Sequence, residues 1–199
     1  MRYSFKLKVL GKVFCSVLKK DEKVKPVIKS VGKEYAEIMK RAKDIGDNNM
    51  LISAYSMAAF FIALNRKDGL PPEENYEIFE NGLLNGSTII RKSLGSGDTY
   101  FSPKKMEARY KWSEETHKHK YENDWEVDVL PGNGDFTMGF DYTQCGVCKL
   151  CRDEGCPELA RYLCRLDFVL VEVIGVGLKR TTTLAEGYDK CDFRFYKKN

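Results

Sequence analysis

The sequence of 199 residues lacks any apolar run close to the roughly 20 residues that a membrane-spanning helix needs. Its first 20 residues also lack the features of a signal peptide: the apolar run at Val13–Leu18 is short, Ser16 interrupts it, and no small-residue cleavage site follows. We therefore expect a cytoplasmic protein with no membrane partner. In a reducing cytoplasm its seven cysteines would be thiols or metal ligands rather than a disulfide framework.

The chain has little excess charge of either sign, with a formal net charge of +4. Only the first 30 residues are strongly basic, with nine Lys/Arg against two Asp/Glu. Nucleic-acid-binding modules combine basic residues with aromatic side chains in a recognisable motif, and no such motif is present. We therefore interpret this region as a solvated basic helix face and expect no nucleic-acid partner.

Composition and length are typical of one globular domain over residues 1–199, with 31% charged and 43% hydrophobic residues. The part up to residue 122 repeats its apolar residues at helical spacing, as in the stripes from Tyr3 to Val17 and from Val31 to Ile45. A segment that is apolar on nearly all sides should be a central buried helix. The expected helices cover residues 3–17, 31–45, 49–66 (the central one), 72 onward and 103 to about 121.

At Trp125 the apolar period changes from helical to two, which predicts strands for residues 123–199. The expected strands cover residues 125–130, 135–142, 178–185 and 191–196, with a helix over residues 157–174. The resulting fold class is α+β: a helical N-terminal half packed with a roughly four-stranded antiparallel sheet, and a buried helix between two C-terminal hairpins.

Four of the cysteines lie within twelve residues, at Cys145, Cys148, Cys151 and Cys156. Their spacing, C-x2-C-x2-C-x4-C-P, is one residue longer than the ferredoxin run, and a second cysteine-rich run is missing. A zinc site would need a second C-x2-C unit or a histidine pair at a suitable distance. We expect no metal or other cofactor, and keep a metal or iron–sulfur cluster on these four cysteines as an alternative.

The sequence has only two histidines, His117 and His119, in a lysine-rich segment. Residues two positions apart do not share a helix face, so we expect both side chains to be solvated rather than metal ligands.

The helix over residues 157–174 carries one acidic residue outside its polar stripe. The stripe is formed by Glu158, Arg161, Arg165 and Glu172, while Asp167 falls on the apolar face. A carboxylate there is costly unless it is paired or hydrogen-bonded, and its pKa is a candidate for a shift.

The last hairpin offers Asp167 a partner. Alternation along residues 178–185 places Arg180 and Thr182 on the apolar side, and alternation along residues 191–196 places Cys191 there. These side chains, with Asp167 and its helical neighbour Cys164, should meet inside an apolar shell. Such an arrangement predicts either a ligand pocket or a buried ion pair that only fixes the helix on the sheet.

The same residues carry a family resemblance. The stretch CPELARYLCRLDFVLVE, followed by LKRTTTLAEGYDKCDFRF, resembles the L-2-amino-thiazoline-4-carboxylic acid hydrolase family through a Cys with an Asp three residues later, R-x-x-T-L-A-E-G and C-D-F. Membership implies an enzyme that opens a small cyclic amidine-like ring to give N-carbamoyl-L-cysteine. Cys148 and Cys151 lie outside the part of the pattern that matches.

The residue chemistry suits such a substrate. Arg180, with Thr182 and Glu186, would bind it, since a guanidinium suits its carboxylate. Asp167 could activate water, or Cys164 or Cys191 could attack the ring carbon as a thiolate. The sequence leaves the water and thiol routes open.

Two other functions remain open, a non-catalytic small-molecule-binding or sensory domain and a cysteine-rich metal protein. A small-molecule substrate is the expected partner, and a homodimer is a possible assembly.

Overall fold

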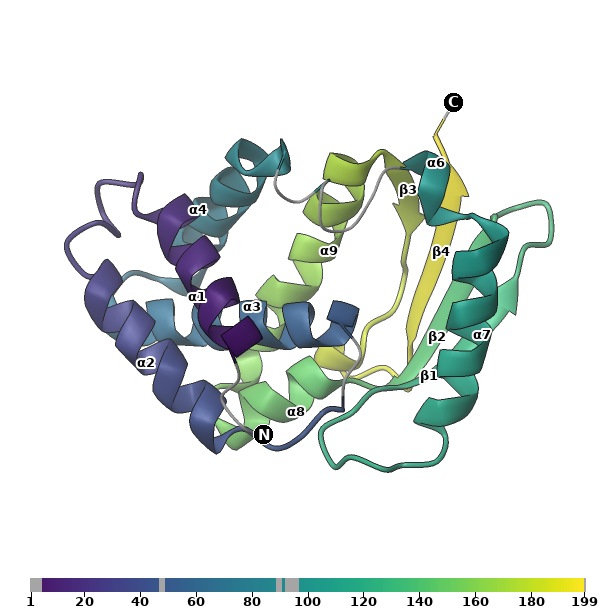
Figure 1. Cartoon of the computed structure of the whole chain (residues 1–199), viewed down its shortest axis with the longest axis horizontal. Helices are drawn as coiled ribbons and strands as arrows, with labels where there is room; N and C mark the ends of the chain where they lie inside the picture. Colours follow the sequence, from purple (N-terminus) through teal and green to yellow (C-terminus); the bar gives the residue numbers. More distant parts are fainter. Residues whose placement is uncertain (1–4, 47–48, 89–90, 92–96, 199) are drawn as a thin grey trace.

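A computed structural model of the chain describes residues 5–46, 49–88, 91 and 97–198. Helices α1–α4 form one side of the molecule, the sheet and α7 form the other, and α9 runs between them (Figure 1). The elements, in chain order, are α1 Phe5–Leu18, α2 Ile28–Arg41, α3 Asn49–Lys67, α4 Pro72–Asn85, α6 Gly97–Tyr100, α7 Pro103–Thr116, β1 Glu126–Pro131, β2 Met138–Gln144, α8 Gly146–Asp153, the 3-10 turn η1 Pro157–Leu159, α9 Ala160–Ile174, β3 Val176–Lys179, the 3-10 turn η2 Leu184–Glu186 and β4 Cys191–Lys197.

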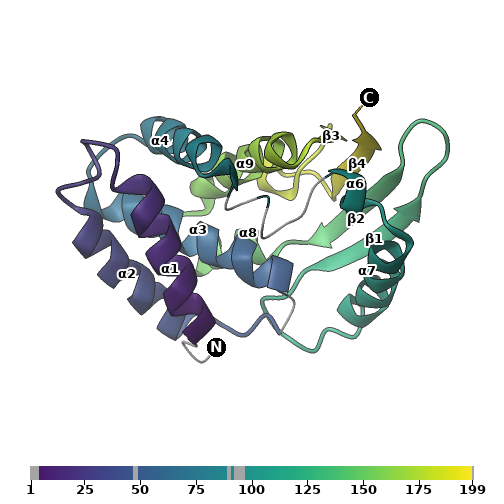
Figure 2. The ribbon, with the colours of Figure 1, turned by 45° about the horizontal axis from the view of Figure 1, so that its top comes forward.

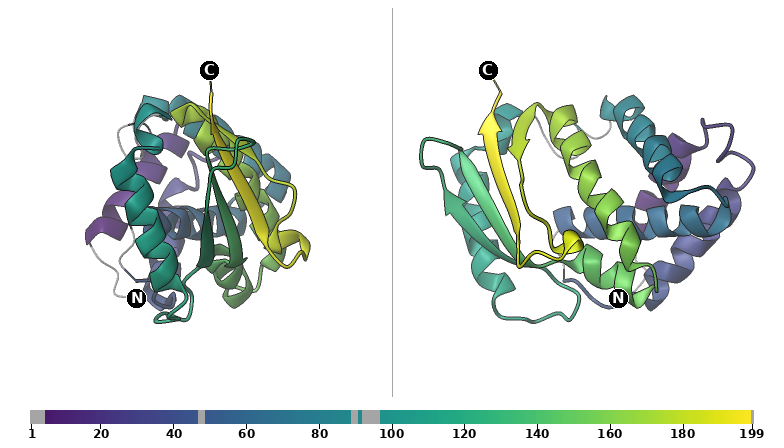
Figure 3. Two further views of the ribbon diagram at one scale, coloured as in Figure 1. Left: turned by 90° about the vertical axis from the view of Figure 1, so that its right-hand side faces the viewer. Right: turned by 180° about the vertical axis from the view of Figure 1, so that it is seen from behind.

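The four strands form one antiparallel sheet in the order β1-β2-β4-β3. The two hairpins therefore join through their second strands, and β2 and β4 lie at the centre. This arrangement confirms the expected α+β fold with a helical N-terminal half. Seen from behind, α9 lies between the sheet and the helical part (Figure 3, right).

Helix α3 is the centre of the helical part, as its all-round apolar sequence predicts. Every residue from Tyr55 to Leu64 is at most 7% exposed. Two hydroxyls buried with it are paired, because the Tyr35 hydroxyl donates to the Leu7 carbonyl at 2.8 Å and lies 2.6 Å from the Ser56 hydroxyl. Full burial of one such apolar side chain stabilises a fold by about 1.5–3 kcal/mol, so α3 is the main support for α1, α2 and α4.

A second apolar cluster lies under the inner face of the sheet. Side chains of α7, of the end of α9 and of the sheet meet there, among them Trp112, Val173, Ile174, Phe140 and Phe195. In Figure 2 the α7 helix runs beside β1 and β2, at the end of the molecule far from α1 and α2. The opposite face of the sheet carries polar side chains, including an ion pair of 2.7 Å between Asp141 and Arg194.

Several expected element boundaries are wrong. Helix α2 ends at Arg41 rather than at residue 45, because Ala42 is already extended with φ −60° and ψ 139°. Strand β2 begins at Met138 rather than at residue 135. Helix α7 ends at Thr116 rather than near residue 121, because the amides of Lys118 and His119 bond to carbonyls three residues back and close the last turn. The strand expected over residues 178–185 is β3, which ends at Lys179. The cysteine segment is a separate helix, α8, rather than only a cap leading into the next helix. Tyr3, expected in the first helix, lies outside the described residues.

Within the described residues, no helix combines the length and the apolar character needed to cross a bilayer. Helix α9 ends at Gly175, whose φ of 74° lies in the left-handed region that glycine adopts without strain. The chain then turns directly into β3, so the end of α9 and the start of the last hairpin are held together. This turn fixes the spacing between the two elements that carry Asp167 and Arg180.

Candidate functional site

Asp167 and Arg180 form the ion pair that the sequence predicts. The Nη1 of Arg180 donates to Oδ2 of Asp167 at 2.7 Å, and its Nη2 donates to the Cys164 carbonyl at 2.9 Å. The Arg180 side chain is only 5% exposed and the Asp167 side chain 35%. The guanidinium carbon also lies 4.9 Å from the ring centroids of both Phe168 and Phe193. Four protein groups thus hold the Arg180 guanidinium.

The electrostatics of the pair make Asp167 a titratable group in the neutral range. Burial raises the pKa of Asp167 to about 6, and the charge and hydrogen bond of Arg180 oppose this effect without cancelling it. A carboxyl with such a pKa can gain and lose a proton near neutral pH, which is the property required of a general acid or base.

Asp192 explains why β3 ends at Lys179. Its carboxylate accepts hydrogen bonds from the backbone amides of Thr181 and Thr182, at 2.8 and 2.6 Å, and from both hydroxyls, at 2.6 and 2.9 Å. These bonds replace the strand ladder after Lys179. The expectation that Thr182 faces Asp167 is therefore wrong, because its hydroxyl is bound to Asp192.

We predict that Asp192→Ala lowers the free energy of unfolding by about 2 kcal/mol at pH 7, because it removes charge-assisted hydrogen bonds from a tight segment. Burial alone would raise the pKa of Asp192, but the bonds from Thr181 and Thr182 outweigh it and lower that pKa to about 2. The contribution is therefore present above about pH 4 and is lost as pH falls toward 2. Urea unfolding at several pH values tests this; the exposed Asp189→Ala is the control.

Two thiols lie beside the ion pair, as expected from the sequence. Cys164 precedes Asp167 by three residues on α9, and the Cys191 sulfur accepts a hydrogen bond from the Leu184 amide at 3.2 Å. Burial raises the pKa of Cys164 well above its usual range, and burial also raises that of Cys191 to about 11. Both side chains are therefore protonated at neutral pH and are poor thiolate nucleophiles.

A pocket of about 400 Å³ opens beside Cys164 and Arg180. It lies between the start of α4, the first half of α9 and the segment around η2. Of the residues expected to bind substrate, Arg180 and Glu186 line it, and Thr183 takes the place expected for Thr182. The Thr183 hydroxyl donates to Oε2 of Glu186 at 2.8 Å. The other residues that line the pocket are Glu73, Arg161, Tyr162 and Arg165.

The model of one protein family, L-2-amino-thiazoline-4-carboxylic acid hydrolase, matches residues 49–195, which are 147 of the 199 residues. The chain belongs to the L-2-amino-thiazoline-4-carboxylic acid hydrolase family. The match includes α3 to β4 and hence every residue of the pair, the thiols and the pocket. No curated protein and no solved structure matches the chain. The family name implies a hydrolase.

In this family member the sequence interpretation missed one residue beside the ion pair. Cys145 precedes α8 in the extended conformation of an N-cap, with φ −131° and ψ 117°. The Cys148 thiol, and then the backbone amides of Cys148 and Val147, lower the pKa of Cys145, while burial and the charge of Asp167 oppose this. A helix N-terminus stabilises a thiolate in this way. The signal available in the sequence was a C-x2-C unit directly after a strand.

One carboxylate acts on three thiols. The charge of Asp167 disfavours ionisation of Cys145, Cys164 and Cys191 alike, so all three lie within its electrostatic range. The phenol of Tyr142 also lies near Asp167, and burial raises its pKa well above the usual range. Tyr142 faces inward on β2 opposite Cys191 on β4, a placement that follows from strand alternation.

Helix α8 is fixed in place at both ends. Glu154, just after its last turn, is 6% exposed at the side chain and pairs with Arg41 at 2.6 Å and with Arg66 at 2.8 Å. Lys149 donates to the carbonyls of Glu122 and Asp124, at 3.0 and 2.9 Å. These contacts hold the N-terminus of the helix, and with it Cys145, against the end of β2.

The side chains of the four close cysteines form two separate contacts, Cys145 with Cys148 and Cys151 with Cys156. Over the part of the chain that the structure describes, no three His, Cys, Asp or Glu side chains gather as metal ligands. The metal or iron–sulfur cluster kept as an alternative on these four cysteines stays a prediction.

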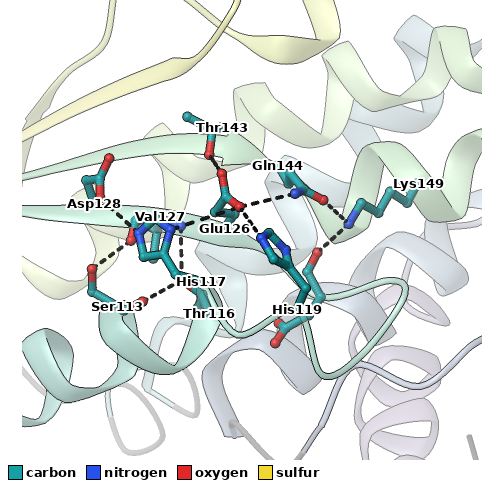
Figure 4. A network of polar contacts seen from close by, with 11 residues as sticks. Ser113, Thr116, His117, His119, Glu126, Val127, Asp128, Thr143, Gln144 and Lys149 are labelled. Atoms are coloured by element: carbon teal, nitrogen blue, oxygen red, sulfur yellow. Dashed lines mark hydrogen bonds and ion pairs between the residues drawn. The ribbon is translucent and has the colours of Figure 1, made fainter.

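The two histidines stay exposed, by 45% and 59% at the side chain, but each meets a carboxylate (Figure 4). Nε2 of His117 lies 3.0 Å from Oδ1 of Asp128, and Nε2 of His119 lies 3.1 Å from Oε2 of Glu126. Because α7 ends at Thr116, the residues are no longer on a helix, and His119 has a positive φ of 47°. Their contacts hold the end of α7 on β1.

Proposed function

We propose that the chain is a hydrolase that opens a small cyclic amidine-like ring, such as that of L-2-amino-thiazoline-4-carboxylate, to give N-carbamoyl-L-cysteine. The observation that carries the proposal is the Asp167–Arg180 pair with three thiols within electrostatic range, beside a pocket lined by arginines. Family membership supports the same reaction class.

Cys145 is the proposed nucleophile. Its thiolate adds to the ring carbon between nitrogen and sulfur, and the bond from that carbon to the ring sulfur breaks. The departing sulfur takes up a proton and becomes the thiol of the product. The carbon is then held by Cys145 as an S-linked isothiourea.

Water completes the reaction. It adds to the isothiourea carbon, ionised Asp167 accepts one of its protons, and Cys145 leaves as a thiolate. The water oxygen becomes the urea carbonyl of N-carbamoyl-L-cysteine. Over the whole cycle the two water hydrogens end on the product thiol and on the former ring nitrogen, so atoms balance and the enzyme is regenerated. Arg180 positions Asp167 throughout.

Arg161 is the proposed contact for the substrate carboxylate. Arg180, expected in this role from the sequence, already donates to Asp167 and Cys164. Arg165 pairs with Glu73 at 2.7 Å. Arg161 lines the same pocket, and among the described residues its contacts are with the neutral Tyr162, whose hydroxyl accepts from Nη2 at 3.2 Å. Its guanidinium can therefore bind a carboxylate in a bidentate manner.

A pair of substrates tests this assignment. We expect Arg161→Ala to raise KM for L-2-amino-thiazoline-4-carboxylate about ten- to a hundredfold with little change in kcat, the effect of losing one charge-assisted contact. For 2-amino-thiazoline, which lacks the carboxylate, KM should stay the same. Arg152→Ala, an exposed arginine of α8 outside the pocket, is the matched control.

The same assay separates catalysis from binding alone. Release of product thiol and ligand binding are measured together on a panel of thiazoline and hydantoin rings. Binding without product for every ring would contradict the hydrolase and favour a sensory domain. If Arg161→Ala raised KM equally for both thiazolines, Arg161 would not be the contact for the carboxylate. The proposed reaction would be unaffected by this result.

A further inference from the structure

Helix α8 carries a pair of thiols at each end. Cys145 and Cys148 contact each other at its N-terminus, and Cys151 and Cys156 contact each other where it ends. All seven cysteines of the chain are free thiols in this structure. The hydrolytic reaction proposed above uses Cys145 as the nucleophile, whereas the thiol of Cys148 only lowers the pKa of Cys145 and takes part in no bond change.

The geometry at the N-terminus suits a disulfide. Residues three apart at a helix turn have their Cβ atoms about 5–6 Å apart, and a disulfide needs about 3.5–4.5 Å. Cys145 precedes the first helical residue and has extended dihedrals, so it can close this gap without breaking a helical residue's conformation. Its carbonyl keeps the first helical hydrogen bond, from the Lys149 amide at 3.0 Å.

The environment also favours attack by Cys145 on an oxidant. The sulfur lies at the N-terminus of α8, next to two backbone amides and the thiol of Cys148. A thiolate at a helix N-terminus with a second thiol one turn later is the arrangement used by dithiol redox sites. Cys164 interacts electrostatically with both residues, but burial raises the pKa of its thiol well above the usual range.

We propose that Cys145 and Cys148 form a reversible disulfide when the protein meets a two-electron oxidant of the peroxide class. The Cys145 thiolate attacks one peroxide oxygen, the O–O bond breaks, and, with one proton taken up, a sulfenic acid and water result. The Cys148 thiol then attacks this sulfur and expels a second water. The two sulfurs lose two electrons and the peroxide is reduced to two waters. A dithiol reductant reverses the reaction by thiol–disulfide exchange.

The disulfide would switch off the proposed hydrolase, because it consumes the sulfur that attacks the ring. This consequence rests on the proposed function, whereas formation of the disulfide does not. The two are therefore measured separately, one by mass and the other by turnover.

The sequence makes the mass measurement simple. Trypsin releases Cys145 and Cys148 together, in the peptide from Tyr121 to Lys149, while each of the other five cysteines falls in a different peptide. The full chain is treated with hydrogen peroxide, its free thiols are alkylated, and it is digested. We expect the Tyr121–Lys149 peptide to be unalkylated and lighter by two hydrogens, and to become fully alkylatable after dithiothreitol.

Two variants sharpen the test. Cys148→Ser should leave Cys145 as a sulfenic acid that dimedone traps. Cys151→Ser, at the other end of α8, should form the same internal disulfide as the natural chain. Circular dichroism confirms that both variants are folded.

The proposal is overturned if the Tyr121–Lys149 peptide remains fully alkylated after peroxide, or if Cys145 is instead linked to the peptide that carries Cys164. If the disulfide forms and turnover falls in proportion and returns on reduction, both the disulfide and the role of Cys145 are supported. If it forms without loss of turnover, the disulfide stands and Cys145 is removed as the nucleophile.

Discussion

Replacing Cys145 by alanine should lower kcat/KM for L-2-amino-thiazoline-4-carboxylate by at least about a thousandfold, the scale seen when a covalent nucleophile is removed. The reason is that Cys145 combines a position beside Asp167 with groups that lower its pKa. Cys164 and Cys191 have raised pKa values, so replacing either of them by alanine should lower kcat/KM less than replacing Cys145 does. Steady-state kinetics on the three variants measures this order.

Cys15→Ala is the control, because this thiol lies on α1, packed near Gly32 of α2. A trapping experiment makes the test more specific. With a slow substrate, the natural chain should carry a covalent adduct on the Tyr121–Lys149 peptide, and Cys145→Ala should carry none. Full activity in Cys145→Ala would show that water attacks the ring directly and would return the mechanism to the route based on Asp167 alone.

The second large effect concerns pH. The pKa of Asp167 is raised to about 6, so kcat should rise as pH increases through 6 and then level off, since the ionised carboxylate is the base. The variant Asp167→Asn keeps the shape of the side chain and one oxygen that can accept the hydrogen bond from Arg180, but its amide cannot act as a base. We expect it to lose about 10²–10⁴-fold in kcat and to show no step near pH 6. A pH–rate profile of both proteins measures the difference.

The pH dependence of the free energy of unfolding gives an independent measurement of the pKa of Asp167. A carboxyl whose pKa is raised in the folded state binds its proton more tightly there than in the unfolded chain. Its stabilising contribution is complete below about pH 4 and is lost as pH rises through about 6. The stability of the natural chain relative to Asp167→Asn should therefore fall between pH 4 and 6. A difference that stays constant, or that grows with pH, would contradict the raised pKa.

The two elements that form the ion pair are held by different forces, which explains how the site is kept in shape. Helix α9 lies against the sheet through apolar contacts such as those of Val173 and Ile174. The segment that carries Arg180 is irregular and is held instead by the Asp192 carboxylate. A substitution in the core should therefore lower stability generally, whereas one at Asp192 should first disturb Arg180.

Periodicity in the sequence determined the architecture and the central ion pair. The change from helical spacing to alternation at Trp125, and the position of Asp167 on the apolar face of its helix, depend only on local geometry. Arg180 lies two residues beyond Leu178, so strand alternation predicted its inward side even though the strand ends at Lys179. The exposed stripe of Glu158, Arg161, Arg165 and Glu172 was predictable for the same reason.

Other features depend on residues that are distant in sequence, and these the sequence did not reveal. Thr182 faces Asp192 because its backbone amide donates to the carboxylate of a residue ten positions later. An alternation pattern does not contain this information. The histidines meet carboxylates of β1 only because α7 ends early and packs along that strand.

The sequence by itself thus determined which residue types are buried, since burial follows from a period that a single segment displays. Only the tertiary structure decided in which direction the pKa of each thiol shifts. The pKa of a cysteine depends on charges and amide dipoles that α8, α9 and β4 bring together, and their sum lowers the pKa of Cys145 and raises those of Cys164 and Cys191.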